Sequence, residues 1–373
     1  MIYLDNNATT AIDPEVLEEM GRVARLAPGN PGSQHAAGRK ARQILEQARE
    51  TIAAILYAKP DEVVFTSGGT ESSNLAIRGL TEGRRGTVLL PPGEHPATER
   101  VVSKLIEEGW KRRALSLDHM GRLIPDELAN ISLDDVKLAT SILAHNETGV
   151  IHNLLPLTER CRASGIPVHV DAVQAVGKID VNFRELGATT LSAAAHKFHG
   201  PRGIGVLLVR EGTRLIPQLH GGFQEQSLRP GTEPVMLAAG MAFALKKWHD
   251  DRVARTETVR RLRDRLQEGL LKAYPKAVVN GDTSHRLPNT LHMAFPGCDS
   301  QALLVALDLA GICCSLGSAC ASGSTELSPV LLGMGLPDEI VKSSLRLSVS
   351  KDNTPEEIER AIEIIGRTVS RMI

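Results

Sequence analysis

The sequence predicts an α/β fold with a mostly parallel sheet, joined to a smaller α+β domain. Between Val63 and Val209, short β-rich runs alternate with stretches of helical spacing, which is typical of a parallel sheet covered on both faces. Past about residue 234 the pattern changes to a long helical region and then to separate strand-like and helical pieces. At roughly 150 residues per domain, 373 residues suggest two domains.

Five apolar runs are predicted strands of the large sheet: Val63–Thr66, Thr87–Pro91, Leu138–Leu143, Val168–Ala172 and Ile204–Val209. Upstream, apolar residues from Ala41 to Leu56 recur at three- and four-residue steps, which predicts one face of a long helix that packs on this sheet. The arginines of Asp251–Lys272 are interleaved with acids, so we interpret this stretch as a solvated helix that connects two domains.

The C-terminal part has the pattern of a smaller α+β domain. Thr290–Phe295 and Leu345–Ser350 are predicted strands, and Ser300–Ala310 and Pro355–Met372 are predicted helices. The uncharged stretch Gly311–Ser324, rich in Gly, Ser, Ala and Cys, predicts a mobile loop.

Charge and composition exclude several classes of protein. The chain has 43 basic and 44 acidic residues, so no global charge favours nucleic acid or an anionic membrane. It begins without a signal-peptide pattern and has no long apolar run, and we therefore expect a cytoplasmic protein that does not span a membrane. Five cysteines without a CxxC pair favour neither a disulfide framework nor a zinc site, and no metal is expected. Of the five, four are interpreted as small buried hydrophobes: Cys161, Cys298, Cys313 and Cys314.

Three motifs could carry chemistry, and each has a simpler structural interpretation. Ser67–Ser72 follows a strand and opens a helix, so it is either a phosphate cradle or a plain turn. Asp171 ends an apolar strand and needs a cation, which could be a protonated cofactor ring or a structural partner. Lys197 precedes a Gly/Pro turn, where a desolvated amine could form an imine, although most lysines are surface residues.

In this order, the motifs resemble the fold-type I enzymes that use pyridoxal 5'-phosphate (PLP). More narrowly, they resemble the class V aminotransferase group and, within it, the cysteine desulfurases. The resemblance covers nearly the whole chain and includes further motifs: Tyr3–Thr10, Asn30–Arg39, Glu94–Ala97, His145–Ile151, Leu228–Thr232, Ser315–Pro329 and Ser343–Ser348. The loop around Cys320 resembles that of the iron–sulfur and nitrogenase-associated desulfurases.

The resemblance implies the PLP-dependent transferase fold, with a large PLP-binding domain of residues 15–255. The small domain would comprise residues 1–14 plus 256–373 and would carry the cysteine loop. Lys197 would hold the cofactor aldehyde as an imine, and Asp171 would keep the pyridine nitrogen protonated. His95 would stack on the ring and move protons.

The remaining cofactor and substrate contacts are also implied by the resemblance. Gln174 and Asn146 would bind the phenolic oxygen, and Asn146 would also touch the substrate. Arg346 would bind the substrate carboxylate through its planar guanidinium. The phosphate would be bound by Gly69, Thr70 and His196, with Thr232 reaching in from a second subunit, which predicts a homodimer.

The implied reaction converts L-cysteine to L-alanine. Lys197 would remove the Cα proton, and the Cys320 thiolate would take the sulfur as a persulfide. A sulfur-acceptor protein, either a scaffold or a thiol carrier, would then receive it for iron–sulfur cluster assembly or for thiolation of a cofactor or tRNA, without direct contact of this chain with nucleic acid. The sequence does not choose among these acceptors.

Three positions depart from the family pattern. Ala194 replaces a Ser or Thr that binds phosphate, Phe223 stands where a run of three glycines is usual, and Leu316 stands where a Ser is common before the cysteine motif. Two alternatives therefore stay open. One is a related class V enzyme, such as a selenocysteine lyase or an aminotransferase, in which Cys320 would be dispensable. The other is a sulfur-carrier scaffold without catalysis, in which Ala194 and Phe223 would reflect lost cofactor binding.

Overall fold

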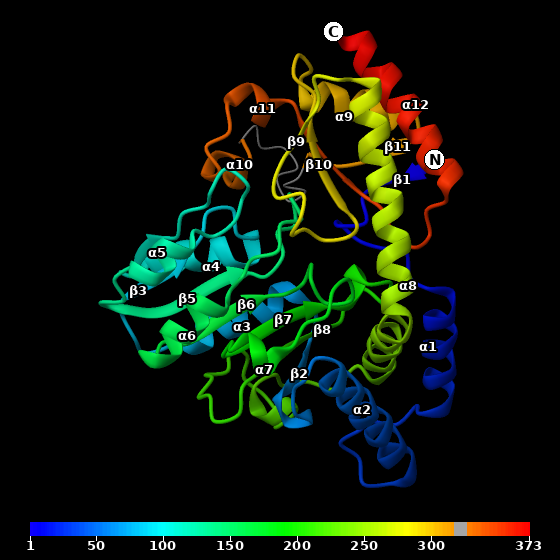
Figure 1. Ribbon diagram of the computed structural model, residues 1–373. Helices are drawn as coiled ribbons and strands as arrows, with labels where there is room; N and C mark the ends of the chain where they lie inside the picture. The colour runs from blue at the N-terminus through cyan, green and yellow to red at the C-terminus, as the bar shows by residue number, and fades with distance from the viewer. Residues whose placement is uncertain (317–326) are drawn as a thin grey trace.

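A computed structural model describes residues 1–316 and 327–373 (Figure 1). Its central sheet has seven strands in the order β2-β8-β7-β6-β5-β3-β4. Strand β8 is antiparallel to β2 and β7, and the remaining neighbours are parallel, which confirms the predicted α/β class. The strands are β2 Val63–Thr66, β3 Thr87–Leu90, β4 Lys111–Ala114, β5 Val136–Ile142, β6 Val168–Asp171, β7 Thr190–Ala194 and β8 Gly205–Val209.

Both faces of the sheet are buried because side chains alternate along each strand. Val64 packs with helices α3 (Gly69–Thr81) and α4 (Pro96–Glu107) on one face. Its neighbour Phe65 packs on the opposite face, where α2 (Ala36–Ile55), α6 (Leu155–Ala163) and the first half of α8 (Val235–Ala273) supply the core. The predicted apolar face of α2 is buried, as expected. Further helices complete this part: α1 Pro14–Leu26, α5 Pro125–Asn130, α7 Phe183–Leu186 and the 3-10 turns η1 Pro60–Glu62, η2 Ala195–Lys197 and η3 Glu225–Ser227.

A second core lies in the C-terminal part of the chain. Strand β10 (Thr290–Ala294) pairs antiparallel with β12 (Ser344–Ser348) and with β9 (Val278–Val279). Helices α9 (Ser300–Leu309) and α12 (Pro355–Met372) pack on it.

The N-terminus joins this second core through β1 (Ile2–Tyr3), which pairs with β11 (Ile312–Cys313). Strand β11 lies within the predicted loop Gly311–Ser324, so that prediction is wrong for its first residues. Local sequence could not reveal the strand, because its partner is about 310 residues away.

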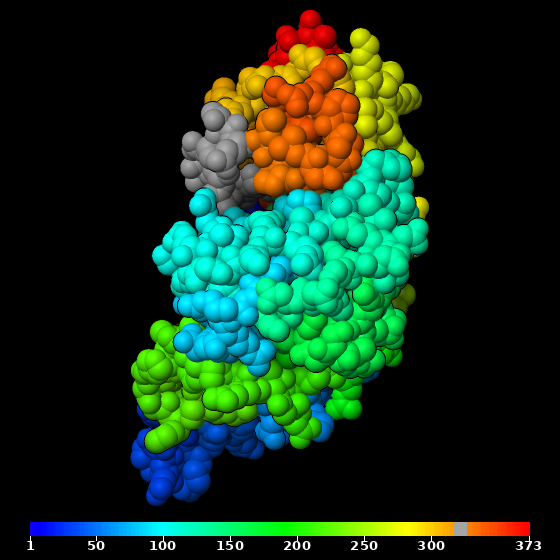
Figure 2. Space-filling model, turned by 90° about the vertical axis from the view of Figure 1, so that its left-hand side faces the viewer, coloured from blue at the N-terminus to red at the C-terminus, as the bar shows by residue number. Residues whose placement is uncertain are grey.

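Helix α8 is 39 residues long and runs through both cores (Figure 1). Its first half, around Leu245 and Trp248, packs with the large sheet, and its second half, around Leu262 and Leu266, packs with the C-terminal core. The helix predicted for Asp251–Lys272 is therefore present as part of α8. Two short helices of the C-terminal part, α10 (Pro329–Gly333) and α11 (Asp338–Lys342), also contact the core of the large sheet. They belong to the orange segment that lies on the cyan and green residues in Figure 2.

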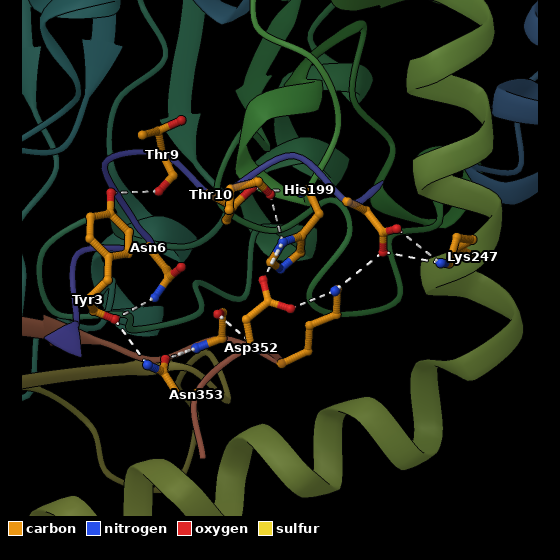
Figure 3. Close-up of polar contacts among 12 residues, drawn as sticks. Tyr3, Asn6, Thr9, Thr10, His199, Lys247, Asp352 and Asn353 are labelled. Atoms are coloured by element: carbon orange, nitrogen blue, oxygen red, sulfur yellow. Dashed lines mark hydrogen bonds and ion pairs between the residues drawn. The ribbon is translucent and has the colours of Figure 1, made fainter. Parts of the chain in front are cut away.

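The N-terminal segment forms hydrogen bonds to both parts of the protein (Figure 3). Asn6 Nδ2 donates to the Ser348 carbonyl at 2.8 Å, and Thr10 Oγ1 donates to the His196 carbonyl at 3.0 Å. The His199 ring faces both the Ala11 carbonyl (3.0 Å) and the Asp352 carboxylate (3.4 Å). The short stretch that carries Lys197 is thus tied to the end of β12. Among the described helices, none is long and apolar enough to cross a membrane, and the cytoplasmic location stays a prediction.

Candidate active site

A cavity of about 290 Å³ opens at the carboxyl ends of β5, β6 and β7, which is where open α/β sheets bind ligands. It brings together eight of the residues that the sequence singled out: Gly69, Thr70, His95, Asn146, Asp171, Gln174, His196 and Lys197. Ala194, the departure from the family pattern, lines the same cavity.

One side of the cavity is suited to an anion. Gly69 and Thr70 form the start of α3, whose N-cap Gly68 makes no side-chain capping bond, so the first turn offers backbone N–H groups and positive partial charge. A Cβ on Gly69 would lie 2.6 Å from Val173 Cγ2, so glycine is required for this close approach. Burial lowers the pKa of His196 to about 4, and its neutral ring lies 3.1 Å from Thr9 Oγ1.

Asp171 is a buried carboxyl group at the end of β6. Its Oδ1 accepts a hydrogen bond from the Val173 N–H at 2.9 Å, and desolvation raises its pKa although the nearby His95 opposes the shift. Among the described residues, no Arg or Lys forms an ion pair with it at salt-bridge distance. The structural ion pair considered from the sequence is therefore not found there, and the carboxyl group lies beside the cavity.

His95 is the N-cap of α4, and its Nδ1 accepts a hydrogen bond from the Ala97 N–H at 3.1 Å. Because Nδ1 is an acceptor, the ring proton lies on Nε2. Desolvation lowers the pKa of His95, so the ring is neutral at neutral pH. Sequence reasoning assigned no role to its neighbour Glu94. This buried carboxyl group accepts a hydrogen bond from the Ile142 N–H at 2.7 Å, and desolvation raises its pKa well above the usual value.

Lys197 lies in η2, and its Nζ donates to the main-chain carbonyls of Asn7 and Ala8, each at 2.8 Å. Gln174 Nε2 donates to the same Asn7 carbonyl at 2.8 Å. The N-terminal segment is therefore part of the site. The motif Tyr3–Thr10 was the available signal for this, but no role was assigned to Asn7.

Arg346 does not line the cavity. Its guanidinium, 1% exposed, donates to Asp5 Oδ1 at 2.7 Å and to the Asn146 carbonyl at 3.0 Å. It is thus adjacent to Asn146, whose side-chain Oδ1 is buried without a hydrogen-bond partner among the described residues.

Two further predicted residues are not brought into the cavity. Thr232 is exposed and is not a lining residue, and Cys320 lies outside the described residues.

The other four cysteines are free and fall into two groups by their exposure. Cys161 and Cys298 are buried as predicted, whereas Cys313 and Cys314 are partly exposed, so the buried interpretation is wrong for them. The reason is that β11 belongs to a two-stranded sheet, which leaves it incompletely covered. Desolvation still raises the pKa of Cys161 to about 11 and that of Cys314 to about 12, which disfavours a thiolate at either position.

Known proteins resemble the whole chain. The family model described as aminotransferase class-V matches residues 2–361. A protein of Trichormus azollae named cysteine desulfurase is 42% identical, and the alignment covers all of this chain and 94% of the relative. A solved structure titled NifS-like protein superposes with a TM-score of 0.92 at 34% identity and 99% coverage of both chains. Another, titled SspA in complex with cysteine, has a TM-score of 0.84 at 28% identity and covers 95% of this chain and 100% of its own.

These matches extend over nearly the full length of the chain, and eight of the nine predicted cofactor residues meet in one cavity at the expected edge of the sheet. The chain therefore belongs to the aminotransferase class-V family and, within it, to the cysteine desulfurases.

Proposed function

We propose that this chain uses PLP held at Lys197 to take the sulfur atom from L-cysteine, releasing L-alanine and leaving a persulfide on Cys320. The observation that carries the proposal is the convergence of Lys197, Asp171 and His95 on one cavity at the carboxyl edge of the sheet. The family consists of PLP enzymes, and the cysteine complex of the SspA structure supports the choice of substrate.

The residues of the cavity fit PLP. Asp171 is a buried carboxyl group without a described cationic partner, and a protonated pyridine nitrogen would provide that cation. The buried Asn146 Oδ1 without a partner and the uncapped start of α3 are further unused polar groups. We propose that Gln174 and Asn146 bind the phenolic oxygen and that Gly69, Thr70 and His196 bind the phosphate.

Bound PLP would supply an electron sink for charge that develops on the substrate Cα. Lys197 Nζ would take the Cα proton, and the Asn7 and Ala8 carbonyls orient this amine. His95 would donate a hydrogen bond from its Nε2–H, since its Nδ1 is engaged by the Ala97 N–H. Arg346 would bind the substrate carboxylate, with its guanidinium held in place by Asp5 and the Asn146 carbonyl.

For Cys320, the proposal rests on the family resemblance of its sequence motif. Its thiolate sulfur would form a bond with the substrate sulfur as the carbon–sulfur bond breaks, and the electron pair of that bond would stay with the carbon skeleton that becomes alanine. A thiol-bearing acceptor protein, a scaffold or a carrier, would then receive the persulfide sulfur.

We propose the same domain division as the sequence suggested, residues 15–255 against residues 1–14 plus 256–373. The two separate cores support it, since Ile2 and Leu4 pack in the C-terminal core whereas Val16 packs in the first. We also propose a homodimer in which Thr232 reaches the partner's phosphate site. The exposure of Thr232 and the 90% exposure of Phe223 nearby in the chain support this, because both are available to a second subunit.

One experiment tests the proposed reaction. Purified protein is incubated with L-cysteine, alanine and sulfide are quantified, and persulfide is mapped by mass spectrometry. We expect Lys197→Ala to abolish alanine formation and Cys320→Ser to abolish the persulfide, while Cys313→Ser, which changes a partly exposed cysteine, leaves both intact. Equal alanine production by Cys320→Ser would instead indicate a related class V enzyme. A colourless native protein that forms no alanine would indicate a scaffold without catalysis.

A further inference from the structure

Lys178 is a buried lysine whose hydrogen bonds go to neutral amide groups. Its Nζ donates to Gln174 Oε1 at 2.5 Å and to Asn7 Oδ1 at 3.0 Å, and no carboxylate pairs with it among the described residues. Desolvation, together with the positive charges of Lys197 and Arg346, lowers its pKa well below the usual value. A neutral amine has two N–H groups, which matches the two acceptors that surround it.

The backbone next to Lys178 is shaped to bring it here. Gly177 has a φ of 76°, and a Cβ at this position would lie 2.2 Å from Phe198 Cβ. Only glycine allows this turn to pack so closely against Phe198, the residue that follows Lys197. As a result, Lys178 and Lys197 reach the two ends of one residue, since Lys178 bonds the Asn7 side chain and Lys197 bonds the Asn7 main-chain carbonyl.

These contacts fix which way the Gln174 amide faces. Its Nε2 donates to the Asn7 carbonyl at 2.8 Å, and its Oε1 accepts from Lys178. In the flipped orientation Oε1 would face the Asn7 carbonyl, which can only accept, so two oxygens would repel each other and the hydrogen bond from Lys178 to Oε1 would be lost. The second N–H of Nε2 is then the polar group that Gln174 can offer to the cavity that it lines.

We propose that Lys178 is a positioning residue, which holds the Gln174 carbonyl so that the amide N–H donates to the phenolic oxygen of bound PLP. This inference rests on the proposed function, because it needs PLP bound at Lys197. A donor on the phenolic oxygen withdraws electron density, which makes the nitrogen that Lys197 contributes less basic. Loss of Lys178 frees the amide to rotate and weakens this donor.

The test is a pH titration of the visible absorption of the PLP-loaded protein. Lys178→Met keeps the length and burial of the side chain but removes both N–H donors. We expect it to raise the pH midpoint of the absorption change by about one unit, since a hydrogen bond to a charged group has an energy of that order. If Lys178→Met does not fold, Lys178→Gln is the second variant. Its side chain is polar but ends one bond short of the Nζ position, so the hydrogen bond to Gln174 Oε1 is weakened and we expect the midpoint to shift in the same direction.

Lys351→Met is the matched control. Lys351 and Lys178 both line a second, smaller cavity of about 40 Å³. The Nζ of Lys351 pairs with Asp13 and Asp352, and it makes no hydrogen bond to Gln174 among the described residues. We expect a wild-type midpoint for this variant. The titration of Gln174→Ala, with and without Lys178→Met, completes a double-mutant cycle, in which Lys178→Met should add no further shift once Gln174 is absent.

The outcomes separate this inference from the proposed function. A wild-type protein without a visible band, or one whose band survives Lys197→Ala, overturns the proposed function and this inference with it. A normal wild-type band with an unchanged midpoint in Lys178→Met overturns this inference alone. Full additivity in the double-mutant cycle also overturns it, because Lys178 would then act independently of Gln174.

Discussion

Asn7 forms hydrogen bonds to several residues of the site, and it is only 1% exposed. Its side-chain oxygen accepts from Lys178 and from Asn289 Nδ2, and its side-chain nitrogen donates to Thr290 Oγ1 and to the Asn146 carbonyl. These partners come from both cores. A change at Asn7 therefore disturbs the environment of Lys197 and the contact between the two parts of the protein together.

At the same scale, Ala194→Ser should restore a phosphate contact. Ala194 lines the cavity, and its Cβ lies 3.8 Å from the position that a Cβ on Gly69 would take, so a hydroxyl group here is next to the start of α3. A hydrogen bond to a charged group contributes about 1.5–3 kcal/mol, so we expect PLP to bind at least about tenfold more tightly. Titration of the cofactor-free protein with PLP, followed by absorbance, gives the dissociation constant.

The control for this prediction is Ala193→Ser, since Ala193 is a member of the core on the opposite face of the sheet. It should give no gain in PLP affinity. If Ala194→Ser binds PLP no more tightly than the wild type, position 194 does not face the phosphate.

The reactive residues of the site could be predicted from sequence better than their supports. Asp171 follows an apolar strand and Lys197 precedes a glycine turn, which are local signals. Lys178 has no such signal, and the motif Tyr3–Thr10 gave Asn7 no role, because the role of both depends on a contact between segments about 170 residues apart. Glu94 was missed for the same reason, since its burial and raised pKa follow from the packing around β5.

Among the elements, η3 depends on the buried ion pair between Glu225 and Arg49. Glu225, Gln226 and Ser227 all have positive φ, an unusual conformation for residues with side chains. The segment is fixed by Glu225, which pairs with Arg49 at 2.6 Å and accepts a hydrogen bond from the Phe65 N–H at 2.7 Å.

Glu225→Gln removes the buried charge partner of Arg49 and leaves it only the partly exposed Glu46, at 3.0 Å, so we expect a loss of up to about 3–5 kcal/mol in the free energy of unfolding. Urea denaturation measures it. The exposed pair Lys59–Glu211 provides the comparison, since Glu211→Gln should change stability by less than about 1 kcal/mol. Equal effects of the two substitutions would show that the buried pair does not hold η3 in place.

The crossing of α8 and α12 depends on a glycine. A Cβ on Gly269 would lie 2.3 Å from Ile362 Cδ1 and 2.7 Å from Ile362 Cγ1. We expect Gly269→Ala to destabilise the protein by about 1–3 kcal/mol through overpacking, although alanine favours the helix.

Gly21→Ala in α1 is the matched substitution, because the nearest atom there is the end of the Arg25 side chain at 3.5 Å. It should stabilise by roughly 0.5–1 kcal/mol. Thermal unfolding of both variants measures the two effects, and a shift in the same direction for both would contradict the proposed role of Gly269 in packing.

Elements with a strong apolar pattern were predictable, and those that depend on distant partners were not. The five strands predicted for the large sheet, the two predicted for the C-terminal part and the long α8 are present. Strand β4 consists of Lys111–Ala114 at the edge of the sheet, where charged side chains hide the strand pattern. Strand β7 is built from small residues such as Ser192 and Ala193, whose burial comes from the neighbouring strands rather than from their own hydrophobicity.

For the molecule as a whole, buried histidines should make stability depend on pH. Burial lowers the pKa of His145, His169 and His292 to about 3 in the folded protein, compared with an ordinary value of 6.5. The unfolded chain therefore binds more protons between these values, so stability is complete above pH 6.5 and falls as the pH decreases toward 3. Each histidine contributes a slope of at most about 1.4 kcal/mol per pH unit.

Because burial raises the pKa of Glu94 and Asp171, these groups act in the opposite direction, and a comparison of variants isolates the histidine effect. We expect His169→Gln to lose less stability than the wild type between pH 8 and pH 5, measured by urea unfolding at each pH. Identical pH profiles would mean that His169 is not neutral in the folded protein.

The hydrogen bonds of the N-terminal segment also determine when the site can be completed during synthesis on the ribosome. The Asn6 and Asn7 amides bond Ser348, so the carbonyls that orient the Lys197 amine reach their final position only after β12 has been translated. The central sheet, complete by residue 209, can form earlier, and Lys197 already belongs to the part of the chain that has then been made. A nascent chain stalled before residue 344 would therefore contain the whole sheet and still lack the completed cavity. Tight binding of PLP would then have to wait until nearly the entire polypeptide has emerged.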